Sequence, residues 1–548
     1  MNGVFQSIRW TEEVPVDDPA DEYEKAEEEH TYDAVSTLSL NIILILCLLL
    51  AYTVKKFRIY SLPESAGSLL VGVVVGGVAR LSTHRLQLFE FSPEVFFFVL
   101  LPPIIFEAGY SLKRKDFFDN IGAITLYAMI GTMISTFVVG GLSFYAARAG
   151  LIQNVDQENP MEALLFGALI SAVDPVATLS IMGNAELRCD PLLYSLVFGE
   201  SVLNDAIAIS LFKVFAKYYN PEGPDWSESE IPSALGSFLT VSLLSIVVGV
   251  VLGLLASFLY KHTALSDYPN LETSLLFSFC YLCYATGEAM GLSGIMALFF
   301  QGIVLSHYNS YNLSPTAHVA SEQIFATLAT LTETAVFLYM GMAVFTGFFS
   351  NYDFLFSVLA LVFCLIGRFL NIFPLSWIAN QCRRANKIGM DMQCVLWFAG
   401  LRGAIAFALA MNMPGPNQQV YATATLSICI FTTVVCGGLT DSMLTRFGMK
   451  QSGDDGDEEG EDGMHLNRLT FTPQPSSPDR RTYPLARRAG RHVYKGAKKI
   501  WKQFDDDYLK TYFGGSTEVQ SAREDDPHLG NYELGMMHDE EDEDEFVT

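Results

Sequence analysis

The chain has 548 residues, half of them hydrophobic, and a formal net charge of −26. Its apolar residues concentrate between positions 36 and 448, at a density that water-soluble domains do not show. This pattern excludes a soluble globular enzyme and a nucleic-acid-binding protein with a basic core, and it predicts a membrane domain between two polar ends.

The first 35 residues are polar, and their acidic run Glu27–Glu29 is typical of a solvated segment. A cleavable signal peptide is not evident, because this N-terminal segment is long and acidic. The apolar run Leu38–Val54 is followed directly by Lys55 and Lys56. Acidic residues before a span and basic residues after it predict an uncleaved first helix with a lumenal or extracellular N-terminus.

Apolar runs divide residues 36–448 into thirteen predicted membrane spans. Their ranges are 36–54, 64–80, 93–109, 117–147, 161–182, 190–217, 231–260, 270–287, 290–308, 318–348, 353–379, 390–412 and 418–446. An odd number of spans places residues 449–548 in the cytosol. The cations Lys113, Arg114, Lys115 and Arg383 then lie in cytosolic loops, as the positive-inside rule requires.

The sixth predicted span carries Glu200, Asn204 and Asp205 within an otherwise apolar stretch. A carboxylate at membrane depth costs several kcal/mol. It is tolerated beside a partner, a water-filled cavity or a cation. The span therefore indicates a pathway for an ion or a proton through the membrane.

The fifth and twelfth predicted spans are each interrupted, one by Asp174–Pro175 and the other by Gly400–Gly403, which includes Arg402. If spans one to six and eight to thirteen are repeats joined by the seventh, the second repeat is inverted and the two interrupted spans correspond. Broken helices at matching positions point to a transport site near the bilayer midplane. A proline kink and a glycine packing contact are the alternative. We predict an all-α polytopic fold with inverted six-helix repeats and two broken, crossing helices.

Helical spacing places Ser201, Asn204 and Asp205 on one face of the sixth span. Their oxygens, with backbone carbonyls around Val173 and Asp174, could coordinate a small hard cation such as Na⁺, K⁺ or Li⁺. Burial disfavours a charged carboxylate. We therefore expect Asp205 to hold a proton until a cation displaces it, so that the two ligands travel in opposite directions. Because residue 204 is an amide, we expect one proton per monovalent cation and no net charge movement.

Glu200 lies about 140° around the helix from Asp205 and needs a cation of its own. We predict that Arg368, within the eleventh span, pairs with it as a structural ion pair. Arg402 would lie near Asp174 and facing helix ends, where it would compensate C-terminal helix dipoles. The alternative for both arginines is that their side chains extend to the membrane surface.

Residues 449–548 are polar and are predicted to form a cytosolic regulatory tail. Within this tail, residues 480–504 interleave basic and aromatic side chains. As a helix, this segment would align four residues in an apolar stripe, namely Val493, Ala497, Ile500 and Phe504. Such a helix can bind an anionic lipid leaflet or a calmodulin-like partner. A solvated linker is the alternative.

These features favour a secondary active exchanger over a cation channel, a receptor or an intramembrane enzyme. A channel needs a continuous pore, whereas a buried acid beside interrupted helices favours alternating access. An enzyme needs a nucleophile or metal ligands, and the sixth span offers Ser201 without a histidine. Three further acids, Glu107, Glu288 and Glu333, are as compatible with an interfacial position as with a functional one.

Five stretches of the chain resemble the eukaryotic sodium/proton exchangers, and the resemblance covers residues 36–448. They are FFFVLLPPIIFEAGY (96–110), SAVDPVA (171–177), FGESVLND (198–205), SGIMALFFQGIVLSHY (293–308) and FAGLRGAIAFA (398–408). The sequences GIVLSHY and NLSP are most similar to the organellar branch, which includes Golgi and endosomal members. The resemblance therefore implies an organellar membrane more than the plasma membrane.

The resemblance also implies a homodimer of thirteen-span protomers, in which a core domain moves against a dimerisation domain. It implies electroneutral exchange of Na⁺ or K⁺ for H⁺, regulation of pH, and no cofactor. The Asn-Asp pair of the family maps to Asn204 and Asp205, and its acid-arginine bridge maps to Glu200 and Arg368. Its broken-helix residues map to Asp174 and Arg402.

Overall fold

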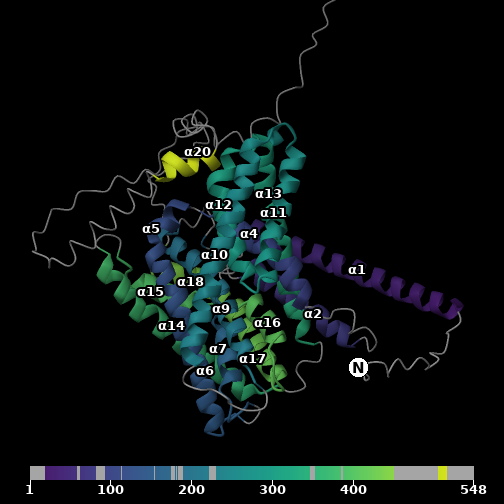
Figure 1. Ribbon diagram of the computed structural model, residues 1–548. Helices are drawn as coiled ribbons and strands as arrows, with labels where there is room; N and C mark the ends of the chain where they lie inside the picture. Colours follow the sequence, from purple (N-terminus) through teal and green to yellow (C-terminus); the bar gives the residue numbers. More distant parts are fainter. Residues whose placement is uncertain are drawn as a thin grey trace, which may run out of the picture.

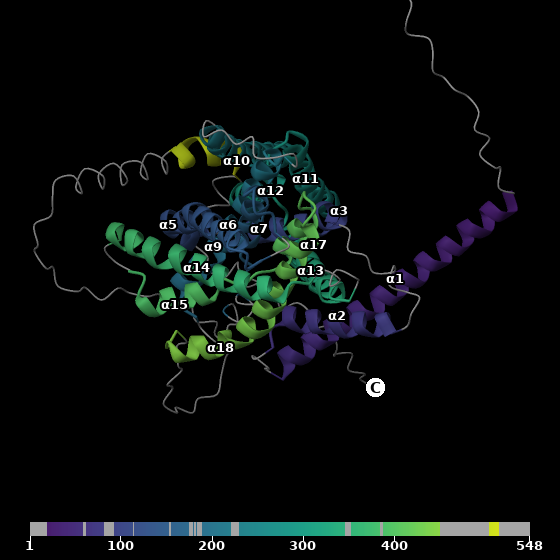
Figure 2. The same ribbon diagram turned by 90° about the horizontal axis from the view of Figure 1, so that it is seen from below.

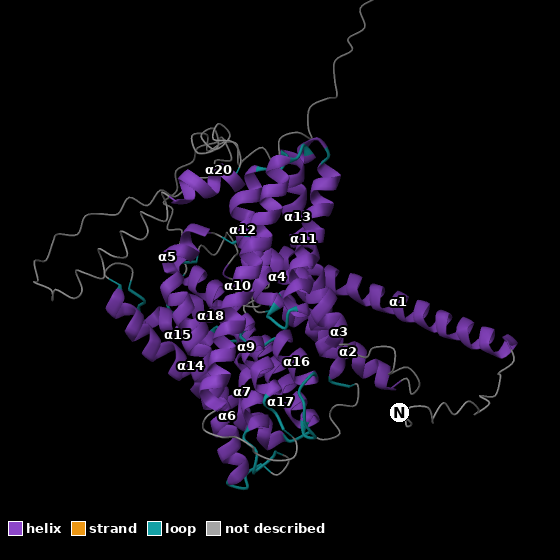
Figure 3. Ribbon diagram, in the orientation of Figure 1, coloured by secondary structure: helices purple, strands orange, loops and turns teal. Residues whose placement is uncertain are grey.

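The computed structural model describes residues 19–57, 62–81, 93–112, 114–152, 155–174, 179, 182, 189–220, 230–345, 352–383, 387–449 and 504–514. These residues form helices and loops, and none of them forms a strand (Figure 3). Eight of the described helices are long and apolar enough to cross a membrane. The predicted all-α, polytopic fold class is therefore confirmed.

Each of the thirteen predicted spans contains at least one described helix. Eight are single helices: α1 (Pro19–Lys56), α2 (Glu64–Leu81), α9 (Pro191–Lys217), α10 (Glu230–His262), α11 (Pro269–Ala289), α12 (Gly294–Tyr308), α13 (Pro315–Ala343) and α14 (Phe354–Cys382). In α1, helix-favouring Glu and Ala residues behind an N-terminal proline extend the helix into the acidic segment, while its apolar part is Thr37–Lys56.

Three further spans each contain one π-helical turn. They are α3 (Pro93–Val95), η2 (Phe96–Leu100) and α4 (Leu101–Tyr110); α5 (Arg114–Thr125), η3 (Leu126–Gly131) and α6 (Thr132–Arg148); and α17 (Gln418–Phe431), η7 (Thr432–Cys436) and α18 (Gly437–Arg446). The two interrupted spans hold the short helices α7 (Met161–Ser171), and α15 (Met390–Phe398) with α16 (Ala404–Met411). Short helical turns are η4 (Leu265–Asp267), η5 (Asn309–Tyr311), η8 (Asp505–Leu509) and α20 (Lys510–Phe513).

The helices pack as two groups. In the first group, α2 packs against α13, and α12 packs against α4, α10 and α11. In the second group, α6 packs against α7 and α14, α9 packs against α5 and α7, and α16 packs against α17. Figures 1 and 2 both separate α11 and α12 from α14 and α15. The groups meet where α9 contacts α10 and α12, and where α16 contacts α13.

Candidate functional site

The two predicted helix breaks lie in contact with each other. Helix α7 ends at Ser171, and α16 begins at Ala404 after a non-helical segment. Between them, the backbone nitrogen of Asp174 donates a hydrogen bond to the carbonyl oxygen of Leu401 at 2.9 Å. A Cβ atom at Gly403 would overlap the Asp174 side chain, so only glycine leaves room for this approach. Beyond Asp174, the fifth span is described only at residues 179 and 182.

The side chain of Arg402 lies against the C-terminal end of α7. Its Nη1 donates to the carbonyl oxygens of Ser171 at 2.8 Å and Ala172 at 3.1 Å. The last carbonyls of a helix lack intrahelical partners, and a positive charge beside them is favourable. The side chain of Thr432, in the π-helical turn η7, accepts a hydrogen bond from the Arg402 backbone nitrogen. Arg402 is only 2% exposed, so it does not extend to the surface.

Glu200 and Arg368 form a buried ion pair, separate from the contacts of Arg402. Both Nη atoms of Arg368 donate to the Glu200 carboxylate, with Nη2 at 3.0 Å from Oε2. The exposed fractions of the two side chains are 4% for Arg368 and 1% for Glu200. Nη2 also donates to the carbonyl oxygen of Leu396 at 2.9 Å. This two-pronged contact joins α9, α14 and α15 through charge-assisted hydrogen bonds.

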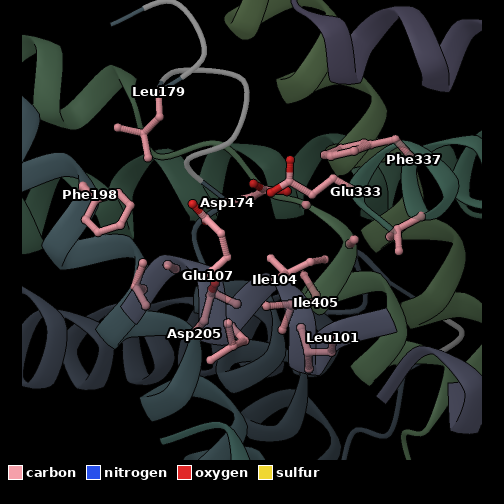
Figure 4. A pocket seen from close by; sticks show the side chains of 18 of the residues that line it. Leu101, Ile104, Glu107, Asp174, Leu179, Phe198, Asp205, Glu333, Phe337 and Ile405 are labelled. Atoms are coloured by element: carbon pink, nitrogen blue, oxygen red, sulfur yellow. The ribbon is translucent and has the colours of Figure 1, made fainter. Parts of the chain in front are cut away.

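A cavity of about 340 Å³ lies between the two helix groups. Helices α4 and α13 line it from the first group, and α9, α16 and the break after α7 line it from the second. Figure 4 shows four labelled acids around this space: Glu107, Asp174, Asp205 and Glu333. The rest of the lining is mostly apolar. When they are ionised, these acidic side chains create a negative potential that attracts cations.

One face of α9 borders the cavity, and it carries Tyr194, Phe198, Val202 and Asp205 at helical spacing. Among the described residues, Val173, Ser201 and Asn204 do not line it. They are nevertheless buried, with exposures of 1–2%. Thus the structure brings Asp174 and Asp205 to the cavity and leaves the other three proposed ligands behind its wall.

Two buried oxygens at this place lack hydrogen-bond partners among the described residues. They are Oδ1 of Asp205 and Oδ1 of Asn204. A buried acceptor without a donor is costly, and such atoms are usually explained by an ion, a water or a functional role. For Asp205, which faces the cavity, a proton or a metal cation would satisfy the oxygen.

From the sequence, an interfacial position and a functional one were both possible for Glu107, Glu288 and Glu333. The structure puts Glu107 and Glu333 at the cavity, which Asp174 and Asp205 also line. An acid inside an apolar run, the signal that identified Asp205, applies to both. Glu288 lies elsewhere: both of its carboxylate oxygens are 2.8 Å from Nζ of Lys213.

The cavity reaches one end of the helix bundle. Its lining includes Ser111, which follows the end of α4 and is exposed, and Tyr194 near the start of α9. The Lys213–Glu288 ion pair lies about two turns beyond Asp205 in the opposite direction along α9. It connects α9 of the second group to α11 of the first. The groups are therefore separated by a cavity on one side of Asp205 and connected by an ion pair on the other.

Comparisons with known proteins agree with this architecture. The family model described as "Sodium/hydrogen exchanger, transmembrane" matches residues 43–446. The chain is 40% identical over 431 residues to sodium/hydrogen exchanger 8 of Rattus norvegicus, which covers 77% of this chain and 74% of that protein. It is 37% identical over 444 residues to sodium/hydrogen exchanger 5 of Arabidopsis thaliana, covering 79% and 83%.

A solved structure also shares the fold. It is the sodium proton antiporter MjNhaP1 from Methanocaldococcus jannaschii, which matches with a TM-score of 0.60 and 18% sequence identity. The match covers 77% of this chain and 99% of that chain. At this level of identity, the likeness concerns the helical architecture.

Proposed function

We propose that this chain, which belongs to the sodium/hydrogen exchanger family, exchanges Na⁺ or K⁺ for H⁺ by alternating access, with Asp205 as the shared binding group. The observation that carries the proposal is the position of Asp205 in an acidic cavity, with a buried carboxylate oxygen that lacks a hydrogen-bond partner in the described part of the chain. A proton or a cation satisfies that oxygen, and each displaces the other. Such competition couples the two fluxes without a cofactor.

Oxygen atoms near Asp205 suit a monovalent hard cation. Asp174 supplies a second carboxylate to the same cavity. We propose that Asn204, Ser201 and the backbone around Val173 complete the coordination shell when Asp205 binds the cation. The unpartnered Oδ1 of Asn204 supports this proposal, because an amide oxygen can coordinate an alkali-metal cation.

The two arginines have positioning roles in this proposal. Arg402 donates hydrogen bonds to the carbonyls at the end of α7 and so fixes the position of the broken segment beside Asp174. Arg368 neutralises Glu200, so that Asp205 is the acid of α9 left to bind the transported ions.

Alternating access requires that one helix group moves against the other. The cavity on one side of Asp205 and the Lys213–Glu288 ion pair on the other support this movement. When the second group carries α9 to the opposite state, the ion pair separates and the cavity mouth closes. Lys213 and Glu288 would then act as a gate on the closed side.

The exchange should be electroneutral. Glu107 and Glu333 lie on helices of the first group and do not travel with α9, and residue 204 is an amide. Asp205 is therefore expected to carry one proton for each cation. In proteoliposomes with a voltage-sensitive dye, a Na⁺ gradient should drive proton flux without generating a membrane potential. A potential that grows with the flux would mean that a second acid, such as Asp174, also cycles.

Glu107 and Glu333 should raise the local cation concentration. Burial disfavours the charged form of both carboxyl groups, so their charge is present at alkaline pH. Replacing either with Gln removes that charge, and we expect KM for Na⁺ at alkaline pH to rise about two- to tenfold with kcat nearly unchanged. Glu322→Gln is the matched control, because Glu322 lies on the surface of the same helix α13. Unchanged KM values in Glu107→Gln and Glu333→Gln, measured at low ionic strength, would remove both residues from this role.

The chain is a multi-pass membrane protein, and we propose that it acts in a Golgi or endosomal membrane as a homodimer with a cytosolic C-terminal tail. The resemblance of residues 302–308 and 312–315 to the organellar branch supports that location. The basic segment 480–504 lies outside the described residues except for Phe504. Its binding to anionic lipid or to a calmodulin-like partner remains a prediction.

A further inference from the structure

A short part of the tail lies against the membrane domain. Residues Phe504–Gly514, here called the tail segment, contain η8 and α20. Figures 1 and 2 both show α20 beside the helical domain, and α20 contacts α10. More than fifty residues separate the tail segment from the end of α18 at Arg446, so this contact is made between distant parts of the chain.

Side chains at the end of α10 and after α12 hold the last turn of the tail segment. Nζ of Lys261 donates to the carbonyl oxygens of Thr511 at 2.5 Å and Gly514 at 2.6 Å. Nδ2 of Asn312 donates to the carbonyl oxygen of Phe513 at 2.8 Å. Carbonyls at a helix C-terminus lack intrahelical partners, and a cation there is favourable. The ring of Phe513 also packs edge-on against Phe258.

A second contact involves a buried carboxylate at the start of the tail segment. Asp505 is 9% exposed, and it accepts a hydrogen bond from the hydroxyl of Tyr308 at 2.5 Å. Its Oδ2 lies 3.4 Å from Nε2 of His307 and 4.0 Å from Nζ of Lys510. Among the described residues, the charged and titratable groups near His307 include Asp505, Lys510 and Tyr308, with Lys261 on the neighbouring helix end.

The docking surface lies next to the cavity mouth. Helix α12 packs against α4, and a Cβ atom at Gly302 would touch Gly109 and Tyr110, directly before Ser111. His307 and Tyr308 lie less than two turns further along α12. A contact made here can bias the movement of the helices that form the mouth.

We infer that the tail segment is a pH-sensitive latch on α10 and α12, which docks more tightly when His307 is protonated. Protonation turns the His307–Asp505 contact into a charged pair, which stabilises the docked tail segment. The positive charges of Lys510 and Lys261 nearby reduce this stabilisation. The added stability of the docked state is therefore present when the imidazole of His307 is protonated, and it is lost as pH rises and the imidazole becomes neutral.

Hydrogen exchange of the full-length protein in lipid nanodiscs tests the latch. Relative to intrinsic rates at each pH, amides of residues 504–514 should be protected at pH 6 and about tenfold less protected at pH 8. Asp505→Asn should lower protection at both values, and His307→Gln should remove the pH dependence. Tyr512→Ala is the control, since Tyr512 is 57% exposed on the same segment. Absent protection, equal protection at both pH values, or an unchanged Asp505→Asn protein would each overturn the inference.

Exchange assays complete the test. Asp505→Asn and His307→Gln should retain transport but shift its dependence on cytosolic-side pH, while Tyr512→Ala should not. A pH profile unchanged in both variants would contradict a regulatory latch. Amide protection is measured without transport, so failure of the latch and failure of the proposed exchange can be told apart.

Discussion

Asp205→Asn should reduce cation/proton exchange in proteoliposomes to the level of protein-free vesicles. The amide has nearly the same shape as the carboxylate, but it neither binds a transported proton nor offers a negative charge to the cation. Asp205 faces the cavity, and its Oδ1 lacks a hydrogen-bond partner among the described residues, so the replacement breaks no hydrogen bond at that oxygen. Loss of transport should therefore occur without loss of assembly.

Two controls separate this effect from misfolding. Asp391→Asn makes the same chemical change at an exposed position in the first turn of α15, and it should leave exchange intact. Added Na⁺ should raise the melting temperature of the parent protein but not that of Asp205→Asn, because ligand binding to the folded state stabilises it. Substantial residual exchange in a well-folded Asp205→Asn protein would contradict the assignment.

The second large effect concerns the pair formed by Glu200 and Arg368. Glu200→Gln or Arg368→Met leaves one buried charge without its partner, and each should lower the free energy of unfolding by about 3–5 kcal/mol. The double variant should recover part of this loss. Recovery should be incomplete, because Arg368 also donates to the carbonyl oxygen of Leu396.

A double-mutant cycle of unfolding free energies measures the coupling. The ion pair between Lys55 and Glu64 is the matched control, because its N–O distance is 3.0 Å but the Lys55 side chain is 67% exposed. A coupling of about 1 kcal/mol or less is expected there. Strictly additive losses for Glu200→Gln and Arg368→Met would show that their contact does not contribute as a pair.

The sequence predicted the helices well because bilayer thickness and uninterrupted apolar runs determine them. The breaks were predictable for a related reason, since Asp174–Pro175 and Gly400–Gly403 interrupt otherwise apolar spans. The resemblance to sodium/proton exchangers is confirmed by the family match over residues 43–446. Glu200 and Arg368 could be paired in advance because a buried charge requires an opposite one.

The cavity wall could not be predicted from the sequence. Helical spacing groups Ser201 and Asn204 with Asp205, but adjacent residues differ by about 100° around a helix. Which part of that face borders the cavity depends on where α4 and α13 lie across the cavity from α9. In the structure Phe198 and Val202 share the border with Asp205. The same dependence on packing hid the positions of Glu107 and Glu333.

The contact between the tail segment and the membrane domain was even harder to predict from the sequence. Asp505 and His307 are about 200 residues apart, and neither belongs to a motif that indicates the other. The apolar stripe predicted within 480–504 gave no sign that the following turn contacts α10 and α12. Such a contact depends on the shape of the receiving surface, which a single sequence does not display.

The most direct test of the account is the pH change inside acid-loaded proteoliposomes after Na⁺, K⁺ or Li⁺ is added outside. Exchange through Asp205 predicts a rise in internal pH for each transported cation that saturates with its concentration, reverses with the gradient and occurs without single-channel currents. Cation flux that leaves internal pH unchanged, or that appears as unitary currents, would contradict exchange and favour a channel.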